Sequence, residues 1–208
     1  MIRCIDCRKP YPQDAIPYRC PACGGLYDWD PLPPLDLQQV SADPGIWHYR
    51  HTFGLPENAP MVYLGEGDTP LVWSLVGDRW VAFKLEFLNP TSSFKDRGTA
   101  VLVSFLQARG VGQAMDDSSG NAGASFAAYA AGAGMAAQVY VPAYAAGPKC
   151  RQIEVYGAEV VAVPGPRSRA SQAVREAVKG GAVYASHALL PHGLPGYATT
   201  AYELVAQL

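Results

Sequence analysis

A regular alternation of strand-length and helix-length segments occupies the chain from Trp80 onward. Short apolar runs alternate with stretches of helical periodicity. Such a chain folds into a parallel sheet with right-handed crossovers, because each helix returns the chain to the start of the next strand. We therefore expect an α/β fold with helices on both faces of a parallel sheet. The expected strands are 80–85, 114–117, 137–141, 159–163 and 183–185, and the expected helices are 96–109, 121–133, 147–156, 168–179 and 197–208.

Four of the five cysteines form two CxxC pairs near the N-terminus. Cys4 and Cys7 make the first pair, and Cys20 and Cys23 the second. Four thiolates with this spacing can converge into the tetrahedral geometry of a structural zinc site. Disulfides would require an oxidising compartment, and a redox CxxC motif would not require a second pair. We expect a structural Zn²⁺ ion in a zinc-ribbon-like module, with no coordination position left open for chemistry.

The chain divides into three parts by composition. Residues 1–30 hold the cysteine pairs, and residues 31–60 are rich in Pro and Asp. We interpret 31–60 as a linker and an aromatic strap that packs on the main body, and 61–208 as the α/β catalytic domain. The final segment keeps an apolar stripe up to Leu208 without a glycine cap or polar tail. We therefore expect the N-terminal part of a longer protein, with a natural short form as the alternative.

Charge and hydropathy exclude several classes of partner. The net charge is −2, and no run of Lys and Arg interleaved with aromatic residues occurs, which argues against nucleic acid. The N-terminus does not have the apolar core of a secretory signal. The most charge-poor stretch, 121–147, is Ala- and Gly-rich and is interrupted by Pro142, which indicates a buried helix and strand and not a membrane span. We expect a cytoplasmic protein.

Lys95 lies at the junction of a loop and a helix, within the segment NPTSSFKDRG (89–98). A lysine nucleophile must lose its proton near neutral pH, which requires partial burial or a cationic neighbour. Phe94 can shield the amine, and Arg97 is close in sequence. The alternative is that Lys95 is an ordinary solvated lysine in the first turn of a helix.

The segment SSGNAG (118–123) lies where an expected strand is followed by an expected helix. Backbone N–H groups and the helix dipole at such a junction favour an anion, for example a substrate carboxylate. The alternative is a common helix start, because neither a P-loop lysine nor a complete GxGxxG motif accompanies the segment.

With these two segments the chain resembles the fold type II pyridoxal-phosphate enzymes, and among them the threonine synthase group. The similarity extends over nearly the whole chain, including the cysteine knuckles that some members carry. The further matching segments are GIWHYR (45–50), GEGDTPL (65–71), KLE (84–86), residues 142–149, YGAEV (156–160), and GYATT (196–200) with Glu203.

The resemblance implies the cofactor pyridoxal 5′-phosphate and a role for each motif residue. Lys95 would bond to the cofactor aldehyde and move protons, and Asn121 would bond the ring oxygen of the cofactor. The resemblance further implies a lyase that converts O-phosphohomoserine and water to threonine and phosphate, with a small amino-acid substrate and a homodimer at full length. The substrate carboxylate would lie in a cradle formed by Ser118, Ser119, Gly120, Asn121 and Ala122.

The chain departs from the family pattern at two places. Many threonine synthases have a threonine where this chain has Ala122. The family also holds the cofactor phosphate in a second Gly-rich loop, which does not occur before Leu208. Two alternatives therefore stay open. One is another fold type II enzyme that replaces or eliminates a group on a small amino acid. The other is a catalytically silent zinc-ribbon protein that only binds a ligand or partner.

Overall fold

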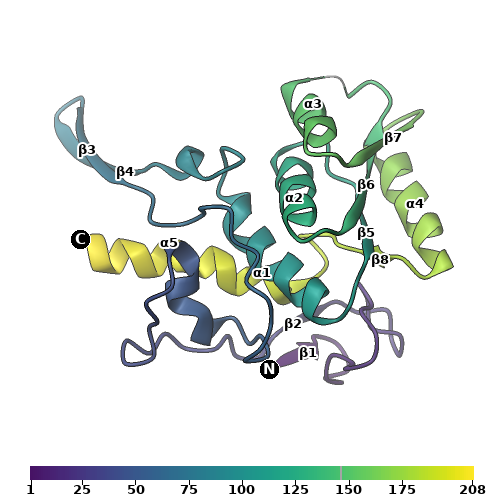
Figure 1. Ribbon diagram of the computed structural model, residues 1–208, viewed down its shortest axis with the longest axis horizontal. Coiled ribbons are helices and arrows are strands. Elements are labelled where there is room, and N and C mark those ends of the chain that lie inside the picture. Colours follow the sequence, from purple (N-terminus) through teal and green to yellow (C-terminus); the bar gives the residue numbers. More distant parts are fainter. Residues whose placement is uncertain (146) are drawn as a thin grey trace.

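The computed structural model describes residues 1–145 and 147–208, and its centre is a four-stranded parallel sheet (Figure 1). The strand order is β7–β6–β5–β8, and every neighbouring pair is parallel. The expected α/β class and parallel sheet are therefore confirmed. The strands are β5 (Gln113–Asp116), β6 (Ala136–Pro142), β7 (Glu159–Val163) and β8 (Val183–Tyr184).

Helices cover both faces of this sheet, as expected. The helices α2 (Asn121–Gly132) and α3 (Pro148–Val155) pack together on one face, and α4 (Arg167–Ala177) covers the other (Figure 1). The helix α1 (Lys95–Ala108) lies against α2, and α5 (Leu194–Gln207) lies against α1. The start of α5 precedes the expected start at 197, because a proline is favourable in the first turn of a helix.

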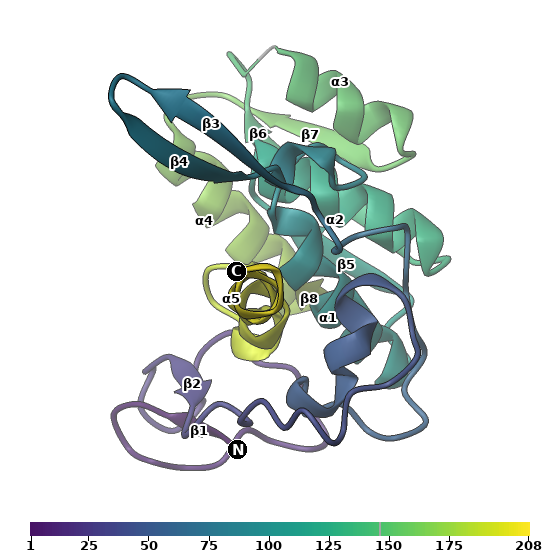
Figure 2. The same cartoon turned by 90° about the vertical axis from the view of Figure 1, so that its left-hand side faces the viewer.

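Residues 80–85 do not belong to the parallel sheet, so this expectation is wrong. The strand β4 (Arg79–Lys84) pairs antiparallel with β3 (Leu71–Val76) in a separate hairpin that projects from the body (Figures 1 and 2). A two-residue turn containing Gly77 at φ +63° joins the two strands, and so short a turn imposes antiparallel pairing. Apolar side chains occupy both faces of the hairpin.

The N-terminal segment forms a small ribbon of its own, with β1 (Ile2–Cys4) antiparallel to β2 (Tyr27–Trp29). The Trp29 indole donates a hydrogen bond to the carbonyl of Pro191 at 2.9 Å, which ties the ribbon to the start of α5. The ring of Tyr11 packs edge-on against both Tyr27 and His192, with centroid separations of 4.7 Å. The three-part division of the chain into domains stays a prediction.

The aromatic segment between the ribbon and the hairpin enters the main core. A 3₁₀ helix, Gly45–Thr52, buries Trp47 completely, and Phe53 follows it into the same cluster. Gly45 has φ +58°, and a Cβ atom there would lie 2.0 Å from the carbonyl oxygen of Glu66. Among the described residues, no helix has both the length and the apolarity that are needed to cross a bilayer. The remaining 3₁₀ helices are Glu86–Leu88, Val178–Gly180 and Pro191–Gly193.

Candidate active site

Lys95 is the first residue of α1, and the turn before it is fixed by its neighbours. The hydroxyl of Ser93 accepts a hydrogen bond from the Lys95 amide at 3.3 Å. Thr91 donates from its amide and its hydroxyl to the two carboxylate oxygens of Asp96, at 2.7 and 2.5 Å. These bonds hold the backbone at the start of the helix, so the Lys95 side chain leaves from a defined point.

The amine of Lys95 is half-buried between two aromatic rings. Its Nζ lies 4.6 Å from the ring centroid of Phe94 and 5.3 Å from that of Tyr197. Burial lowers the pKa of Lys95 below its ordinary value, while the charge of Asp116 acts in the opposite direction. Partial burial, one of the two conditions for a lysine nucleophile, is therefore met.

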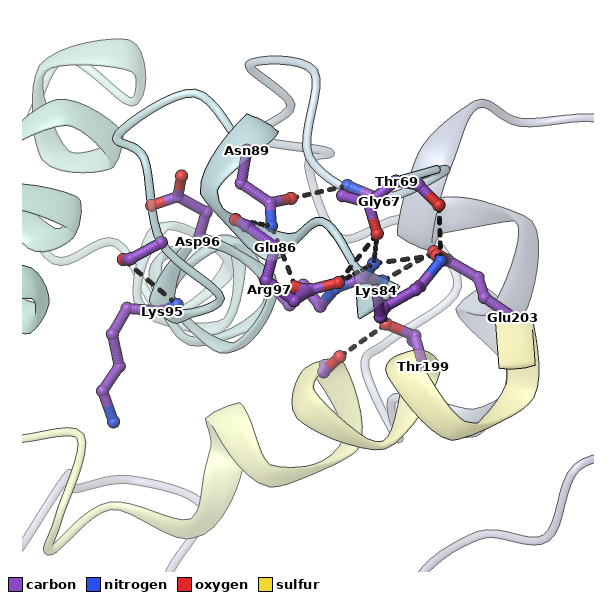
Figure 3. A network of polar contacts seen from close by, with 12 residues as sticks. Gly67, Thr69, Lys84, Glu86, Asn89, Lys95, Asp96, Arg97, Thr199 and Glu203 are labelled. Atoms are coloured by element: carbon purple, nitrogen blue, oxygen red, sulfur yellow. Dashed lines mark hydrogen bonds and ion pairs between the residues drawn. The ribbon is translucent and has the colours of Figure 1, made fainter. Parts of the chain in front are cut away.

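Arg97 is not the cationic neighbour of this amine, because its side chain points into a separate buried cluster (Figure 3). The guanidinium is fully buried and pairs with Glu203 at 2.6 Å and with Glu86 at 2.8 Å. Lys84 Nζ lies 2.5 Å from the other oxygen of Glu203. Burial alone would raise the pKa of Glu203, but the hydrogen bonds from Arg97 and Lys84 hold it below its ordinary value. The cluster joins α1 to α5 and to the hairpin.

Two glycines allow α1 and α5 to touch. A Cβ atom on Gly98 would lie 2.2 Å from the ring of Tyr197, and one on Gly196 would lie 2.1 Å from the carbonyl oxygen of Arg97. No side chain fits at either point without a shift. This close approach places the ring of Tyr197 beside the Lys95 amine.

The expected cradle lies at the start of α2, directly after β5. Asn121 is the first helical residue and is exposed, whereas Ala122 is buried. Ser118 accepts a hydrogen bond from the Gly120 amide at 3.3 Å. A Cβ atom on Gly123 would lie 1.8 Å from the Ser118 carbonyl oxygen, so the turn is as tight as a glycine permits. The first N–H groups of the helix have no intrahelical partners and can bind an anion.

The structure brings Lys95 and the cradle to the same region. The helices that carry them, α1 and α2, pack along each other. Asp116, two residues before Ser118, acts electrostatically on Lys95. Lys149 of α3 donates to the carbonyl oxygen of Thr91 at 3.0 Å and so links the third helix to the Lys95 loop.

Three nearby residues were not predicted as site residues: Asp116, Tyr197 and Lys149. Tyr197 and Lys149 lie in segments that match the family, but no role was assigned to them from the sequence. The doubled aspartate at the end of a strand was an available signal for Asp116, since neighbouring strand residues face opposite sides of a sheet. Tyr197 lies 102 positions beyond Lys95 in the printed numbering, and only the helix packing reveals its role.

Two hollows lie on this side of the molecule. A pocket of about 270 Å³ borders the cradle and is lined by Ser119, Lys149 and Cys150 among others. A larger one of about 810 Å³ lies between α3 and the strands β6 and β7, and Lys95 does not line it. Its walls are mostly apolar, so we place the candidate site by the reactive groups at Lys95 and not by pocket size. Cys150 is a packed residue of α3, as expected.

The four N-terminal cysteines converge. Their Sγ atoms all lie within 4.8 Å of one another, with Cys4 and Cys23 at 3.5 Å and Cys7 and Cys20 at 3.6 Å. Four sulfur atoms bound tetrahedrally to zinc lie about 3.8 Å apart, given a zinc–sulfur distance of about 2.3 Å. The arrangement fits a four-thiolate metal site, and all four cysteines are free of disulfide bonds.

The chain is similar to a family of known enzymes. The family model for pyridoxal-phosphate dependent enzymes matches residues 62–208. The chain belongs to this family. It is 34% identical over 218 residues to the threonine synthase of Methanocaldococcus jannaschii, an alignment that covers 99% of this chain and 54% of that protein. It is 37% identical over 164 residues to the threonine synthase of Synechocystis, which covers 76% and 43%. The family member thus spans about half the length of the curated relatives it matches.

Solved structures show the same fold. A pyridoxal 5′-phosphate-dependent aspartate racemase is similar with a TM-score of 0.60 and 32% identity, over 67% of this chain and 46% of that one. Maize serine racemase gives a TM-score of 0.62 over 67% of this chain and 44% of that one, and at 23% identity it supports the fold alone. The family member therefore has the fold of these enzymes in the part that aligns.

Proposed function

We propose that this chain carries the reactive lysine of a threonine-synthase-like enzyme, which converts O-phosphohomoserine and water to threonine and phosphate. The observation that supports this best is the half-buried Lys95 amine, which stands near a strand-to-helix turn able to bind an anion. The similarity to curated threonine synthases supports the choice of reaction. The activity of the whole protein is part of the proposal.

The residues present fit pyridoxal 5′-phosphate. Lys95 offers an amine with a lowered pKa, and the glycine at 123 keeps the cradle backbone close to Ser118. When bound, the cofactor supplies an electron sink for carbanion chemistry. Lys95 would hold it covalently and would move a proton at Nζ. Asn121 would hydrogen-bond the ring oxygen of the cofactor.

The cradle would orient the substrate. The start of α2 favours an anion, so the carboxylate of an amino acid would lie against the N–H groups of this turn. Ala122 offers no hydroxyl there, which sets this cradle apart from that of many threonine synthases. The residues that we assign to this role are Ser118, Ser119, Gly120, Asn121 and Ala122.

We also propose that Cys4, Cys7, Cys20 and Cys23 bind a structural Zn²⁺ ion. The convergence of their four sulfur atoms supports this assignment. All four coordination positions would be filled by thiolates, so the metal would stabilise the N-terminal ribbon and take no part in the reaction.

The first test is covalent capture. The purified chain is incubated with pyridoxal 5′-phosphate, reduced with borohydride and digested, and the modified lysines are mapped by peptide mass. We expect the label on Lys95, and Lys95→Arg should abolish it. Labelling scattered over surface lysines such as Lys179, whose side chain is 70% exposed, would contradict the proposal.

A second fold type II reaction on a small amino acid is the competing function, and Ala122 is the observation in its favour. Phosphate release from O-phosphohomoserine separates the two. Release that depends on Lys95 supports the threonine synthase reaction. The competing reaction is favoured if Lys95 captures pyridoxal 5′-phosphate and the protein turns over another small amino acid but releases no phosphate from O-phosphohomoserine.

A further inference from the structure

Asp116 is a buried acidic residue whose side chain the proposed chemistry does not yet use. It ends β5 and is 1% exposed, and neither carboxylate oxygen has a well-aligned hydrogen-bond partner within the described ranges 1–145 and 147–208, although the backbone amides of Asp117 and Ser118 favour its ionised form. Other buried carboxylates in this region, those of Asp96 and Glu203, are bonded. A buried carboxyl without partners costs free energy and calls for a functional explanation.

The neighbouring residue shows which way Asp116 faces. Asp117 accepts a hydrogen bond from Ser171 and lies 3.8 Å from Arg167, so it points toward α4. Successive residues at a strand end point to opposite faces, which directs Asp116 to the other face of the sheet, where α2 packs. Lys95 and Tyr197, which lie together there, both respond to the charge of Asp116.

The Lys95 amine is the natural partner for this carboxyl. Within the described part of the chain Nζ lies against the rings of Phe94 and Tyr197, and neither ring carries a countercharge. An ammonium and a carboxylate that share a region of low dielectric interact strongly even without direct contact. We propose that Asp116 is a positioning residue whose buried carboxyl group controls the proton on the Lys95 amine. This inference rests on the proposed function, because it assigns Asp116 a role at the same lysine.

The pKa values of Asp116 and Lys95 are shifted toward each other. Burial, assisted by the charge of Asp117, raises the pKa of Asp116 to about 7, although the amides of Asp117 and Ser118 and the charge of Arg167 oppose this. Burial lowers the pKa of Lys95 below its ordinary value. The two shifts bring the proton affinities of this carboxyl and this amine closer together than those of a free aspartate and a free lysine, so the charge state of one group depends on that of the other. The other titratable groups that act on this pair or its surroundings are Asp96, Lys149, Tyr184, His187 and Tyr197.

The test measures the Lys95 proton directly and without cofactor. The folded chain is labelled with a trace of acetic anhydride at a series of pH values, and modification of Lys95 is quantified by peptide mass. Asp116→Asn removes the charge but keeps the shape. We expect its Lys95 titration to move to lower pH by about one unit, so labelling should increase by up to about tenfold at pH values well above 7, where Asp116 of the native chain is ionised.

Asp117→Asn is the matched control, since it removes the adjacent carboxylate on the opposite face. It also removes a charge that opposes ionisation of Asp116, so we expect labelling of Lys95 to stay unchanged or to fall slightly. Equal titration curves for Lys95 in the native chain and in Asp116→Asn would overturn the proposal. So would an equal shift in both variants, because that would indicate a general change of charge.

A measurement on the native chain keeps the proposal testable if a variant does not fold. The Lys95 labelling curve should show a second inflection near pH 7, where Asp116 ionises, and a curve for a single independent amine would contradict the proposal. The result is also separable from the proposed function. A shifted Lys95 titration without pyridoxal-phosphate capture would refute the enzyme assignment and leave the Asp116 pairing intact. Capture at Lys95 with an unshifted titration would support the enzyme assignment and overturn the Asp116 pairing.

Discussion

Two charged clusters at the start of α1 differ in how completely their charges are paired. Arg97 and Lys84 meet Glu86 and Glu203 at hydrogen-bond distance, and Thr69 and Thr199 complete the set (Figure 3). Two residues earlier in the helix, Lys95 faces aromatic rings and a carboxyl group at longer range. Each helical residue turns by about 100°, so Lys95 and Arg97 point to opposite sides.

This difference indicates a structural role for the Arg97 cluster and agrees with the chemical role proposed for Lys95. Breaking a buried ion pair costs stability, because removal of any member leaves another charge without compensation. The Arg97 cluster therefore fixes the backbone of α1 against α5. The lysine on the opposite side lies against aromatic rings instead, which agrees with the proposal that it exchanges a proton and bonds a ligand. Four substitutions test this distinction, and they follow in order of decreasing expected effect.

Lys95→Ala should abolish capture of pyridoxal 5′-phosphate at this helix while the stability of the fold changes by less than about 1 kcal/mol, since the side chain is half-buried and, among the described residues, Nζ lies against aromatic rings and not in a contact ion pair. Borohydride trapping measures the first effect and urea denaturation the second. Lys179→Ala, at an exposed surface lysine, is the control and should leave both unchanged. A strongly destabilised Lys95→Ala variant would show that this lysine is also structural.

Arg97→Met should destabilise the fold by about 3–5 kcal/mol, because Glu86 and Glu203 would lose their buried partner. Urea denaturation gives the change in the free energy of unfolding. Arg167→Met is the control, since that arginine is 57% exposed and lies 3.8 Å from Asp117. We expect less than about 1 kcal/mol for the control. Similar losses in both variants would contradict the distinction between the clusters.

Asp116→Asn should stabilise the fold at pH 8, by at most about 4 kcal/mol. The pKa of Asp116 is raised to about 7 in the folded chain, so its contribution to stability is fully present below about pH 4 and is lost as the pH rises through 7. The asparagine does not ionise and escapes this loss. The stability difference between variant and native chain should therefore grow from pH 4 to pH 8, and a difference independent of pH would refute the assignment.

Gly98→Ala should destabilise the fold by about 1–3 kcal/mol, because the new methyl group would meet the ring of Tyr197. It should also slow capture at Lys95, since that ring would have to move away from the amine. Gly112→Ala is the control, because a Cβ atom there meets nothing within 4 Å. Thermal unfolding and borohydride trapping are the two measurements. An unchanged capture rate would mean that Tyr197 does not position the lysine.

Local patterns predicted most of the fold. Alternation of apolar runs and helical periodicity is encoded within each segment, which is why the parallel sheet and its helices agree with expectation. The strand at 80–85 was real, but its partner was not predicted, since pairing depends on the preceding strand and on the turn at Gly77. A strand pattern alone does not say which strand lies beside it.

The residues of the candidate site also differ in whether they could be predicted from the sequence. Lys95 and the cradle stand out because they fall at junctions of elements that the sequence marks. Tyr197 and Asp116 could not be found so easily, because their roles depend on which helices touch and on which side of a strand end faces the lysine. The direction taken by Arg97 was equally invisible, since neighbouring helix residues look alike in sequence whether they are paired or not.

The projecting hairpin carries exposed tryptophans whose fluorescence can report whether the hairpin is covered. Of the four tryptophans, Trp73 and Trp80 lie on the hairpin with 54% and 68% exposure, whereas Trp47 is buried. Indoles in contact with water emit at longer wavelengths than indoles in an apolar core. Any polypeptide that covers the hairpin should therefore shift the fluorescence emission of Trp73 and Trp80 to shorter wavelengths and leave that of Trp47 unchanged. Binding at the hairpin can thus be followed by intrinsic tryptophan fluorescence.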